Sequence, residues 1–441
     1  RPPRSTLFPY TTLFRSMGKS FKNVGNRLIL TLAAAFALVL ITAFPVKAAS
    51  KPSPITGLKQ IEGSSTSVKV SWSCLGGSDT RYKVEISEQP STGYIVVDKN
   101  EYSSPTWISN LEAGKTYYVR ITPFVEDDDT YEIIWGDTSA PVKVVTAPDK
   151  APATLTHTKS TTNSITVNWS AVPGADIYQV EYYTDSSKAM KCVTTGTSIT
   201  LKKLAKNEAY TVYITGGRKY ADGTTVAWSD SSISKLGIPV KPSNVSGVEV
   251  NYYWQNLSEI SVRNSTIECA DGYQYQLYTA YKDKDSKIKT VTTSSTYPQT
   301  YIKTSALKKH NFYKVRVRAY ALNSKNEKMY GGWSSWKYVS PQPDVTKAKN
   351  NKSKKGIQIN WDKIKGANRY VVYVSNKKDS GYKKFQTTTK TGTVIKKCGK
   401  SKLKSGKTYY FYIAPQKKVG NKYVSGLAGN ANYCWKLKYK K

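Results

Sequence analysis

The chain has 441 residues, with 67 Lys and Arg side chains against 30 Asp and Glu, which gives a formal net charge of +37. Its only two histidines, His157 and His310, lie far apart in the sequence, so no Ser/His/Asp or Cys/His arrangement is expected within one small domain. We therefore predict a protein with no catalytic residues, no cofactor and no metal site.

The N-terminal region precedes the repeated part of the chain. Residues 1–16 contain a run that resembles a translated sequencing adapter, and we interpret them as an artefact. Residues 17–48 combine a basic start, an apolar run over 28–44 and small residues at the end, which predicts a signal peptide that is cleaved on export. An uncleaved membrane anchor is the alternative, because the apolar run approaches the length that spans a bilayer.

A pattern of Leu, a Tyr six residues later, and then alternating apolar residues occurs four times. The four tyrosines lie 93, 103 and 96 residues apart, a period the size of one small domain. We therefore predict four domains and call them the first to fourth segments: 51–147, 148–240, 241–341 and 342–441. The Leu and Tyr pairs are Leu111 and Tyr117, Leu204 and Tyr210, Leu307 and Tyr313, and Leu403 and Tyr409.

Apolar and polar residues alternate with a period of two in each segment, which is typical of half-buried antiparallel strands. In the first segment the alternation predicts strands over 68–72, 82–86 and 142–145. The second and fourth segments repeat it over 165–169 and 357–361.

The third segment is the least regular. Asn264 and Arg263 lie nine and ten residues before Tyr273, where the other segments have a Trp. Its core is expected to be filled differently, and Trp254 is a candidate.

The early tryptophans, the tyrosines that begin the following strands, and the spacing from Leu to Tyr together resemble tandem fibronectin type III domains of an exported bacterial type. The resemblance covers residues 51–441 and implies an all-β fold of four immunoglobulin-like sandwiches after a cleaved signal peptide. It implies that a Trp fills the core between the sheets in three segments, and that the Tyr hydroxyl bonds to the backbone near the Leu in all four. The residues concerned are Trp72, Trp169, Trp361, Tyr117, Tyr210, Tyr313 and Tyr409.

Five cysteines do not form the pattern of a disulfide framework. They are Cys74, Cys192, Cys269, Cys398 and Cys434. Only Cys398 and Cys434 share a segment and could pair; the alternative is that all five are buried free thiols.

Tyrosines that point away from the core are expected on several strands. They could contact sugars or proteins, or simply suit solvent-facing strand positions. These tyrosines are Tyr118, Tyr183, Tyr213, Tyr410 and Tyr412.

Positive charge increases along the chain. The net charges of the four segments are −4, +3, +8 and +23, and the fourth holds 26 basic side chains against 3 acidic ones. Self-repulsion of this size favours a polyanionic partner, although a solubility role would produce the same composition. The candidate binding residues are Lys383, Lys384, Lys396, Lys397, Lys400, Lys402, Lys404, Lys417 and Lys418.

We therefore expect a non-enzymatic, secreted or cell-wall-associated binding or adhesion protein whose fourth segment holds polyanionic envelope or matrix polymers. Glycans and extracellular proteins are the other expected partners. Nucleic acid is disfavoured because lysine dominates and no recognition helix is predicted. One alternative is a set of accessory modules of a glycan-degrading enzyme whose catalytic domain is missing from this sequence, and another is a self-assembling surface protein.

Overall fold

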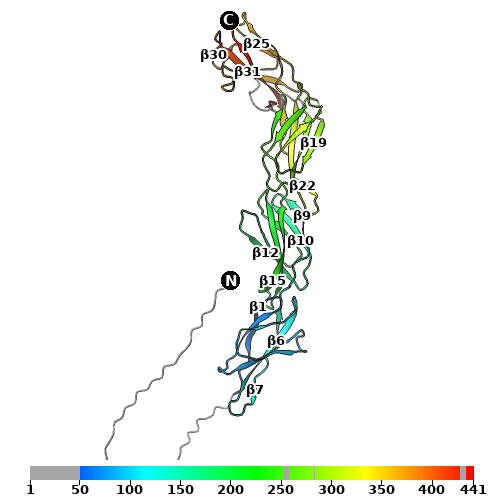
Figure 1. Ribbon diagram of the computed structural model, residues 1–441, viewed down its shortest axis with the longest axis vertical. Helices are drawn as coiled ribbons and strands as arrows, with labels where there is room; N and C mark the ends of the chain where they lie inside the picture. The colour runs from blue at the N-terminus through cyan, green and yellow to red at the C-terminus, as the bar shows by residue number, and fades with distance from the viewer. Residues whose placement is uncertain (1–49, 253–257, 283, 428–433) are drawn as a thin grey trace, which may run out of the picture. The chain divides into compact units, whose positions relative to one another are not determined.

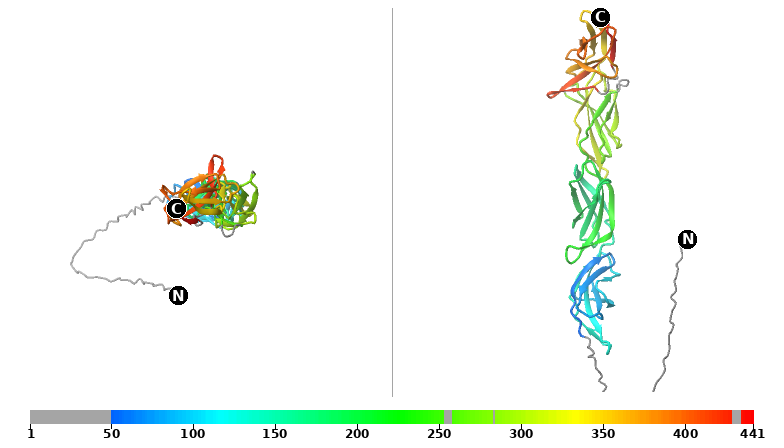
Figure 2. Two further views of the ribbon diagram at one scale, coloured as in Figure 1. Left: turned by 90° about the horizontal axis from the view of Figure 1, so that it is seen from above. Right: turned by 90° about the vertical axis from the view of Figure 1, so that its left-hand side faces the viewer.

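The computed structural model describes residues 50–252, 258–282, 284–427 and 434–441. All regular elements in these ranges are β-strands, as Figures 1 and 2 show, which confirms the predicted all-β class. Within the same ranges, no helix is long and apolar enough to cross a bilayer. The adapter-like residues, the predicted signal peptide and Trp254 lie outside the described residues.

The first segment forms two antiparallel sheets, one with the order β1-β2-β5 and one with the order β4-β3-β6-β7, where β8 also pairs with β6. Its strands are β1 (Thr56–Gly63), β2 (Val68–Ser73), β3 (Arg81–Ser87), β4 (Ile95–Glu101), β5 (Thr106–Ile108), β6 (Thr116–Glu126), β7 (Ile133–Trp135) and β8 (Val142–Val145).

The second segment pairs its strands in the orders β13-β10-β9 and β12-β11-β14-β15. They are β9 (Leu155–Thr161), β10 (Ser164–Trp169), β11 (Ile177–Tyr183), β12 (Met190–Thr194), β13 (Ser198–Lys202), β14 (Ala209–Lys219) and β15 (Val226–Pro239).

The third segment has the orders β16-β17-β20 and β19-β18-β21-β22, with β23 also on β21. Its strands are β16 (Glu249–Tyr252), β17 (Glu259–Arg263), β18 (Gly272–Thr279), β19 (Lys287–Thr293), β20 (Gln299–Lys303), β21 (Tyr313–Leu322), β22 (Lys328–Tyr330) and β23 (Lys337–Val339).

The fourth segment has the orders β24-β25-β28 and β27-β26-β31-β32, with β33 also on β31, and a separate hairpin β29-β30. Its strands are β24 (Val345–Asn351), β25 (Gly356–Trp361), β26 (Arg369–Ser375), β27 (Lys383–Thr388), β28 (Gly392–Ile395), β29 (Lys397–Cys398), β30 (Ser401–Lys402), β31 (Thr408–Val419), β32 (Lys422–Ser425) and β33 (Trp435–Lys438).

The three predicted core tryptophans lie between the sheets. Trp72, Trp169 and Trp361 are 6%, 5% and 3% exposed, and each contacts the ring of a tyrosine on the next strand edge-on. Their indole Nε1 atoms are buried without a hydrogen-bond partner among the described residues. The apolar ring, rather than a polar contact of the indole, therefore holds these side chains in place.

Each of the four corner tyrosines accepts a hydrogen bond from the backbone N–H five residues earlier in the chain. The distances are 3.0 Å for Tyr117, 2.8 Å for Tyr210, 2.7 Å for Tyr313 and 2.9 Å for Tyr409. In each segment the donor is the residue directly after the Leu that lies six residues before the Tyr. The bond therefore fixes the loop that leads into the next strand.

Replacing Tyr117 with Phe is expected to cost about 1 kcal/mol of local stability, because the partly buried N–H of Glu112 loses its acceptor while the ring stays in place. Hydrogen exchange of peptides from β6 should speed up about fivefold. Tyr118→Phe on the same strand is the control and should leave exchange unchanged. Equal exchange in Tyr117→Phe and the native chain would contradict the role of the hydroxyl.

A second set of tyrosine hydroxyls, which the sequence analysis did not identify, fixes the turn before the following strand. Tyr178, Tyr273 and Tyr370 accept hydrogen bonds at 2.9, 3.0 and 2.9 Å from the backbone N–H six residues earlier. These tyrosines are the second residues of β11, β18 and β26. The turns before β11, β18 and β26 are therefore held by the same type of hydrogen bond.

The third segment compensates for the missing Trp with a small residue at the Trp position and a large residue on the strand that packs against it. Asn264, nine residues before Tyr273, is buried, and its Oδ1 accepts a hydrogen bond of 3.1 Å from the hydroxyl of Tyr275. Tyr275 is fully buried and stands two residues after Tyr273, where the second and fourth segments have Val180 and Val372. A large side chain from β18 thus fills the space that a Trp fills elsewhere.

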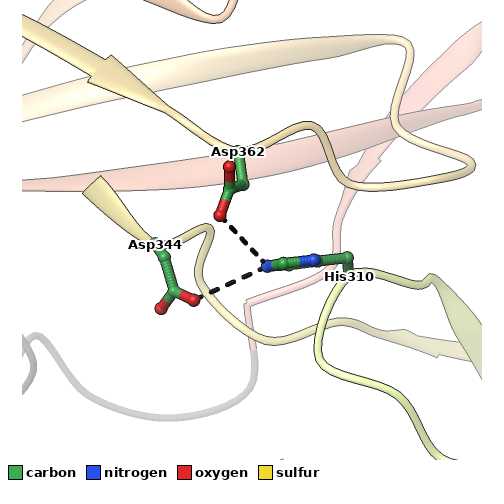
Figure 3. A group of neighbouring side chains, drawn as sticks. All are labelled: His310, Asp344 and Asp362. Atoms are coloured by element: carbon green, nitrogen blue, oxygen red, sulfur yellow. Dashed lines mark ion pairs between the residues drawn. The ribbon is translucent and has the colours of Figure 1, made fainter. Parts of the chain in front are cut away.

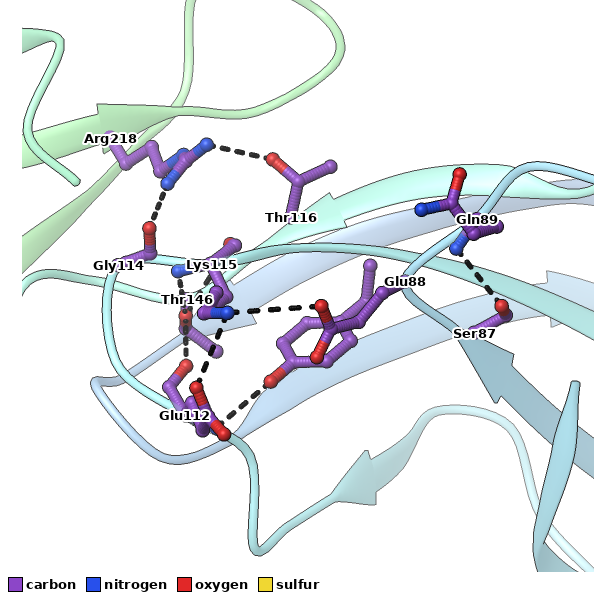
Figure 4. A network of polar contacts seen from close by, with 10 residues as sticks. Ser87, Glu88, Gln89, Glu112, Gly114, Lys115, Thr116, Thr146 and Arg218 are labelled. Atoms are coloured by element: carbon purple, nitrogen blue, oxygen red, sulfur yellow. Dashed lines mark hydrogen bonds and ion pairs between the residues drawn. The ribbon is translucent and has the colours of Figure 1, made fainter. Parts of the chain in front are cut away.

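The loop after Leu111 contacts the second segment. Arg218 donates hydrogen bonds to the carbonyl oxygen of Gly114 and, at 2.7 Å, to Oγ1 of Thr116 (Figure 4). Gly114 and Gly174 both have a positive φ, and a Cβ on Gly174 would lie 2.5 Å from the Cα of Gly114. No side chain fits at this contact.

A comparable contact joins the third and fourth segments. Gly366 has a φ of 89°, and a Cβ there would lie 2.6 Å from the carbonyl oxygen of Ala280. Phe312 of the third segment is fully buried in the same core as Trp361 of the fourth.

All five cysteines are free thiols in the structure, including Cys398 and Cys434. Of the two alternatives left by the sequence, the disulfide between these residues is not formed. The expectation of burial is correct for Cys269, whereas the other four are partly exposed.

Candidate functional site: a lysine-lined cavity

Four lysines of the fourth segment line one cavity of about 550 Å³. They come from β27, from the β29-β30 hairpin and from the loop that leads into β31. The lysines are Lys383, Lys402, Lys404 and Lys407. Ser401, Thr408 and Tyr410 add hydroxyl groups to the lining, and no carboxylate lines it.

The backbone that carries these lysines is held by hydrogen bonds. The N–H of Lys404 donates to the hydroxyl of Tyr409 at 2.9 Å, so the corner of this segment fixes one side of the cavity. The N–H of Tyr439 donates to the carbonyl of Lys407 at 2.8 Å, and that of Gly406 donates to the carbonyl of Tyr439 at 2.8 Å. Lys402 pairs with Lys397 across the hairpin. The lysine side chains are exposed, but their attachment points are fixed.

The structure brings together three of the nine lysines that the sequence singled out: Lys383, Lys402 and Lys404. The others lie elsewhere in the segment and do not line the cavity: Lys384 on β27, Lys396 and Lys397 before and on β29, Lys400 in the hairpin turn, and Lys417 and Lys418 on β31. Lys407 was missed. A usable signal was present, because Lys402, Lys404 and Lys407 all stand around the fourth Leu and Tyr corner.

The positive charge of the fourth segment is not neutralised by its own carboxylates. In the described part of the chain, six of the nine basic side chains of the first segment form ion pairs, whereas none of the 26 in the fourth does so. Two of the three acids of the fourth segment, Asp344 and Asp362, face Lys309 and His310 of the third. The lysines around the cavity therefore repel one another without an internal counter-charge.

The charge of Lys383 also acts on a neighbouring thiol. Burial raises the pKa of Cys398, and the positive charge of Lys383 opposes part of that rise. The thiol is thus kept protonated at neutral pH, and the cavity presents ammonium and hydroxyl donors rather than a nucleophile.

A second cavity, of about 450 Å³, lies between the second and third segments and contains the buried His157. This residue is 3% exposed, although it lies on β9, at the edge of its sheet. Its Nδ1 lies 3.3 Å from Oγ of Ser324, which also accepts hydrogen bonds from the N–H of His157 at 2.8 Å and from Nζ of Lys235 at 2.7 Å.

The pair of His157 and Ser324 lacks the third group of a catalytic triad. Nε2 of His157 is buried and has no hydrogen-bond partner among the described residues. Burial, and then the charge of Lys235, lower the pKa of His157 to about 4. The imidazole is therefore neutral at physiological pH and is not oriented by a carboxylate.

Arginines and aromatic rings alternate on one face of the third segment. The guanidinium of Arg318 lies 3.7 Å from the ring centre of Tyr330 and 4.4 Å from that of Trp333. Arg316 lies 4.4 Å from Trp333 and 4.7 Å from Trp336. The cations cover the ring faces, so the array stabilises the sheet surface and offers no bare aromatic platform.

The outward tyrosines behave in a similar way. Tyr183 stacks on Tyr213 with ring centres 6.1 Å apart, and Tyr412 stacks on Tyr373 at 4.7 Å. The rings cover one another across neighbouring strands. This favours the architectural interpretation of these tyrosines over stacking on sugars.

Comparisons with known proteins agree with this fold. Residues 150–235 match the family model of the fibronectin type III domain. A chitinase A1 from Niallia circulans is 29% identical over 140 residues, which cover 30% of this chain and 18% of the chitinase. The match thus spans less than a fifth of that relative.

Among solved structures, the chain is similar to the FN1–FN3 domains of chicken CNTN1, with 18% identity, coverage of 66% of this chain and 99% of the other, and a TM-score of 0.26. It is also similar to a two-domain fibronectin type III segment of chicken tenascin, with 21% identity, coverage of 42% and 98%, and a TM-score of 0.23. The family match thus covers residues 150–235, within the second segment, and the fold is all-β throughout the described residues.

Proposed function

We propose that the fourth segment binds an anionic polymer and thereby retains the protein on a surface that carries such a polymer. The observation that carries this proposal is the unpaired charge: 26 basic side chains form no ion pair in the described residues, and four of them line one cavity. A polyanion supplies the counter-charge that the segment lacks.

The chemistry of the cavity favours phosphate or sulfate groups along a flexible chain. Lysine ammonium groups attract anions as point charges, without the bidentate geometry that arginine imposes on carboxylates or bases. Arg369 is the only arginine of the segment, and its guanidinium lies 3.5 Å from the ring centre of Tyr423 and donates to Gln416. Recognition should therefore depend on charge density more than on the identity of the repeating unit.

Replacing Lys383, Lys402, Lys404 and Lys407 together with Gln is expected to weaken the binding of long-chain polyphosphate to the full chain by about 10-fold or more at low salt. The dependence of log affinity on log salt should become less steep, because fewer counterions are released. Affinities measured by fluorescence titration at several salt concentrations test both expectations.

A matched variant with the same change in charge separates a site from a diffuse surface. Lys347, Lys349, Lys352 and Lys354 lie on or directly after β24 and do not line the cavity. Their replacement with Gln should weaken binding less than the cavity variant does. Equal losses in the two variants would show that the cavity binds no better than the rest of the basic surface. Binding that is absent or insensitive to salt would overturn the proposal.

A second candidate function is that of an accessory module of a glycan-degrading enzyme. The similarity of 140 residues to a chitinase A1 favours it. The same experiment includes insoluble chitin as a further ligand. Retention on chitin that survives both high salt and the cavity variant would support the accessory role and argue against anionic polymers as the main partner.

A further inference from the structure

Three potential metal ligands meet between the third and fourth segments. His310 stands in the loop before β21, Asp344 directly before β24, and Asp362 directly after β25, and their side chains point toward one another (Figure 3). Nε2 of His310 lies 3.5 Å from Oδ2 of Asp344 and 3.4 Å from Oδ2 of Asp362. The three ligand atoms all lie within 4.8 Å of one another.

The imidazole nitrogen at the centre of this group faces two carboxylates but makes no hydrogen bond in the described structure. This atom, Nε2 of His310, is also closed to solvent. A buried polar atom without a hydrogen bond costs free energy, and a cation that all three atoms bind would supply the missing interaction.

The distances suit a cation placed between the three atoms. Metal ions of the zinc type bind imidazole nitrogen and carboxylate oxygen at about 2.0 to 2.2 Å, which puts neighbouring ligands of a tetrahedron about 3.3 to 3.6 Å apart. Both separations from Nε2 fall in this range. Three protein ligands leave the fourth position to water.

The backbone that carries the ligands is already ordered. The N–H of Asp362 donates to the carbonyl of Asp344 at 2.9 Å, and the N–H of Lys365 donates to the carbonyl of His310 at 2.7 Å. Phe312, two residues after His310, is fully buried and donates its N–H to Lys365 at 3.0 Å. An ion that binds here does not have to order the loops first, which removes a large part of the usual entropic cost.

We propose that His310, Asp344 and Asp362 form a binding site for a divalent transition-metal ion such as Zn²⁺ or Co²⁺, which joins the third segment to the fourth. The sequence analysis predicted no metal site, because the ligands come from two segments and share no spacing motif. The proposal is independent of polyanion binding, since none of its residues lines the lysine cavity.

Lys309 competes with the ion. Its Nζ lies 2.7 Å from Oδ2 of Asp344, the same oxygen that faces His310, and its side chain is 52% exposed. A bound ion displaces this ammonium group into solvent. Removing the ammonium group should therefore tighten metal binding, which a purely structural ion-pair cluster would not show.

Titration of the full chain with Co²⁺ tests the site through the visible absorption of the tetrahedral ion. One equivalent should bind and be displaced by Zn²⁺. His310→Gln and Asp362→Asn should each weaken binding about 100-fold or more, whereas Lys309→Gln should strengthen it several-fold. His157→Gln, at the other histidine of the chain, is the control and should bind as the native protein does.

Several results would overturn the proposal. They are the absence of a visible band in both the native protein and Lys309→Gln, undiminished binding by His310→Gln, and a thiolate charge-transfer band that places the ion on a cysteine. Thermal melts of each variant without metal identify any that do not fold. Lys309→Gln keeps all three ligands and so tests the site even if a ligand variant is unstable.

Discussion

Trp169→Ala is expected to lower the free energy of unfolding of the second segment by about 3 to 5 kcal/mol. The side chain is 5% exposed and lies in a core with Val167, Tyr178 and Tyr210. Its removal deletes a large apolar ring and leaves a cavity that the flanking strands cannot close. Hydrogen exchange of peptides from β10 and β11 measures the loss segment by segment.

Two further variants make this expectation more specific. Trp169→Phe should cost clearly less than Trp169→Ala, because it keeps part of the ring and removes an indole N–H that has no partner. Trp107→Ala is the exposed control: this side chain is 46% exposed, and its loss should cost less than about 1 kcal/mol. Unchanged exchange in Trp169→Ala would place the residue outside the core.

Acidification from pH 6.5 to pH 4 is expected to destabilise the contact between the second and third segments by up to about 3 kcal/mol through His157 alone. The pKa of this imidazole is lowered to about 4 in the folded chain, from an ordinary value of 6.5. Between these values the unfolded state takes up a proton that the folded state excludes, so stability is complete above pH 6.5 and falls as the pH decreases.

The same residue can be observed directly. The chain has two histidines, so a proton NMR titration of the ring signals assigns His157 by comparison with His310→Gln. Lys235→Gln should raise the pKa of His157 and reduce the loss of stability, because the nearby charge is the second cause of the low value. An ordinary pKa for His157, or the same pH dependence in His157→Gln, would contradict the expectation.

Local pattern was enough to predict several of the strands and the four corners. The alternation over 142–145 corresponds to β8, and Val68, Val70 and Trp72 are buried while Lys69 and Ser71 are not. The spacing from Leu to Tyr located the four corner tyrosines, whose hydroxyls each accept a bond from the backbone. These features depend on residues close together in sequence, where the alternation of apolar and polar residues identifies the buried face of a strand.

Features that join distant residues could not be predicted in this way. Ser324 reaches His157 across 167 positions, and the exchange of Trp for Tyr275 and Asn264 needs the pairing of two strands to be known. For the lysine cavity, composition identified the segment, and three of the four lysines were named, but which side chains face one hollow follows from the hairpin and the corner. A count of charged residues does not say which side chains face the same cavity, whereas the fold does.

The close approach of Gly114 and Gly174 limits how such segments can be recombined. The turn before β11 and the turn before β26 both present a glycine, Gly174 and Gly366, to the preceding segment. At the corresponding turn, four residues before Tyr273, the third segment has Cys269 instead. In an engineered chimera, the second and fourth segments could therefore present a glycine to a foreign neighbour, whereas the third would bring the side chain of Cys269 into the contact. The residue at this one turn position thus limits which segment can follow another, in addition to any effect of their different net charges.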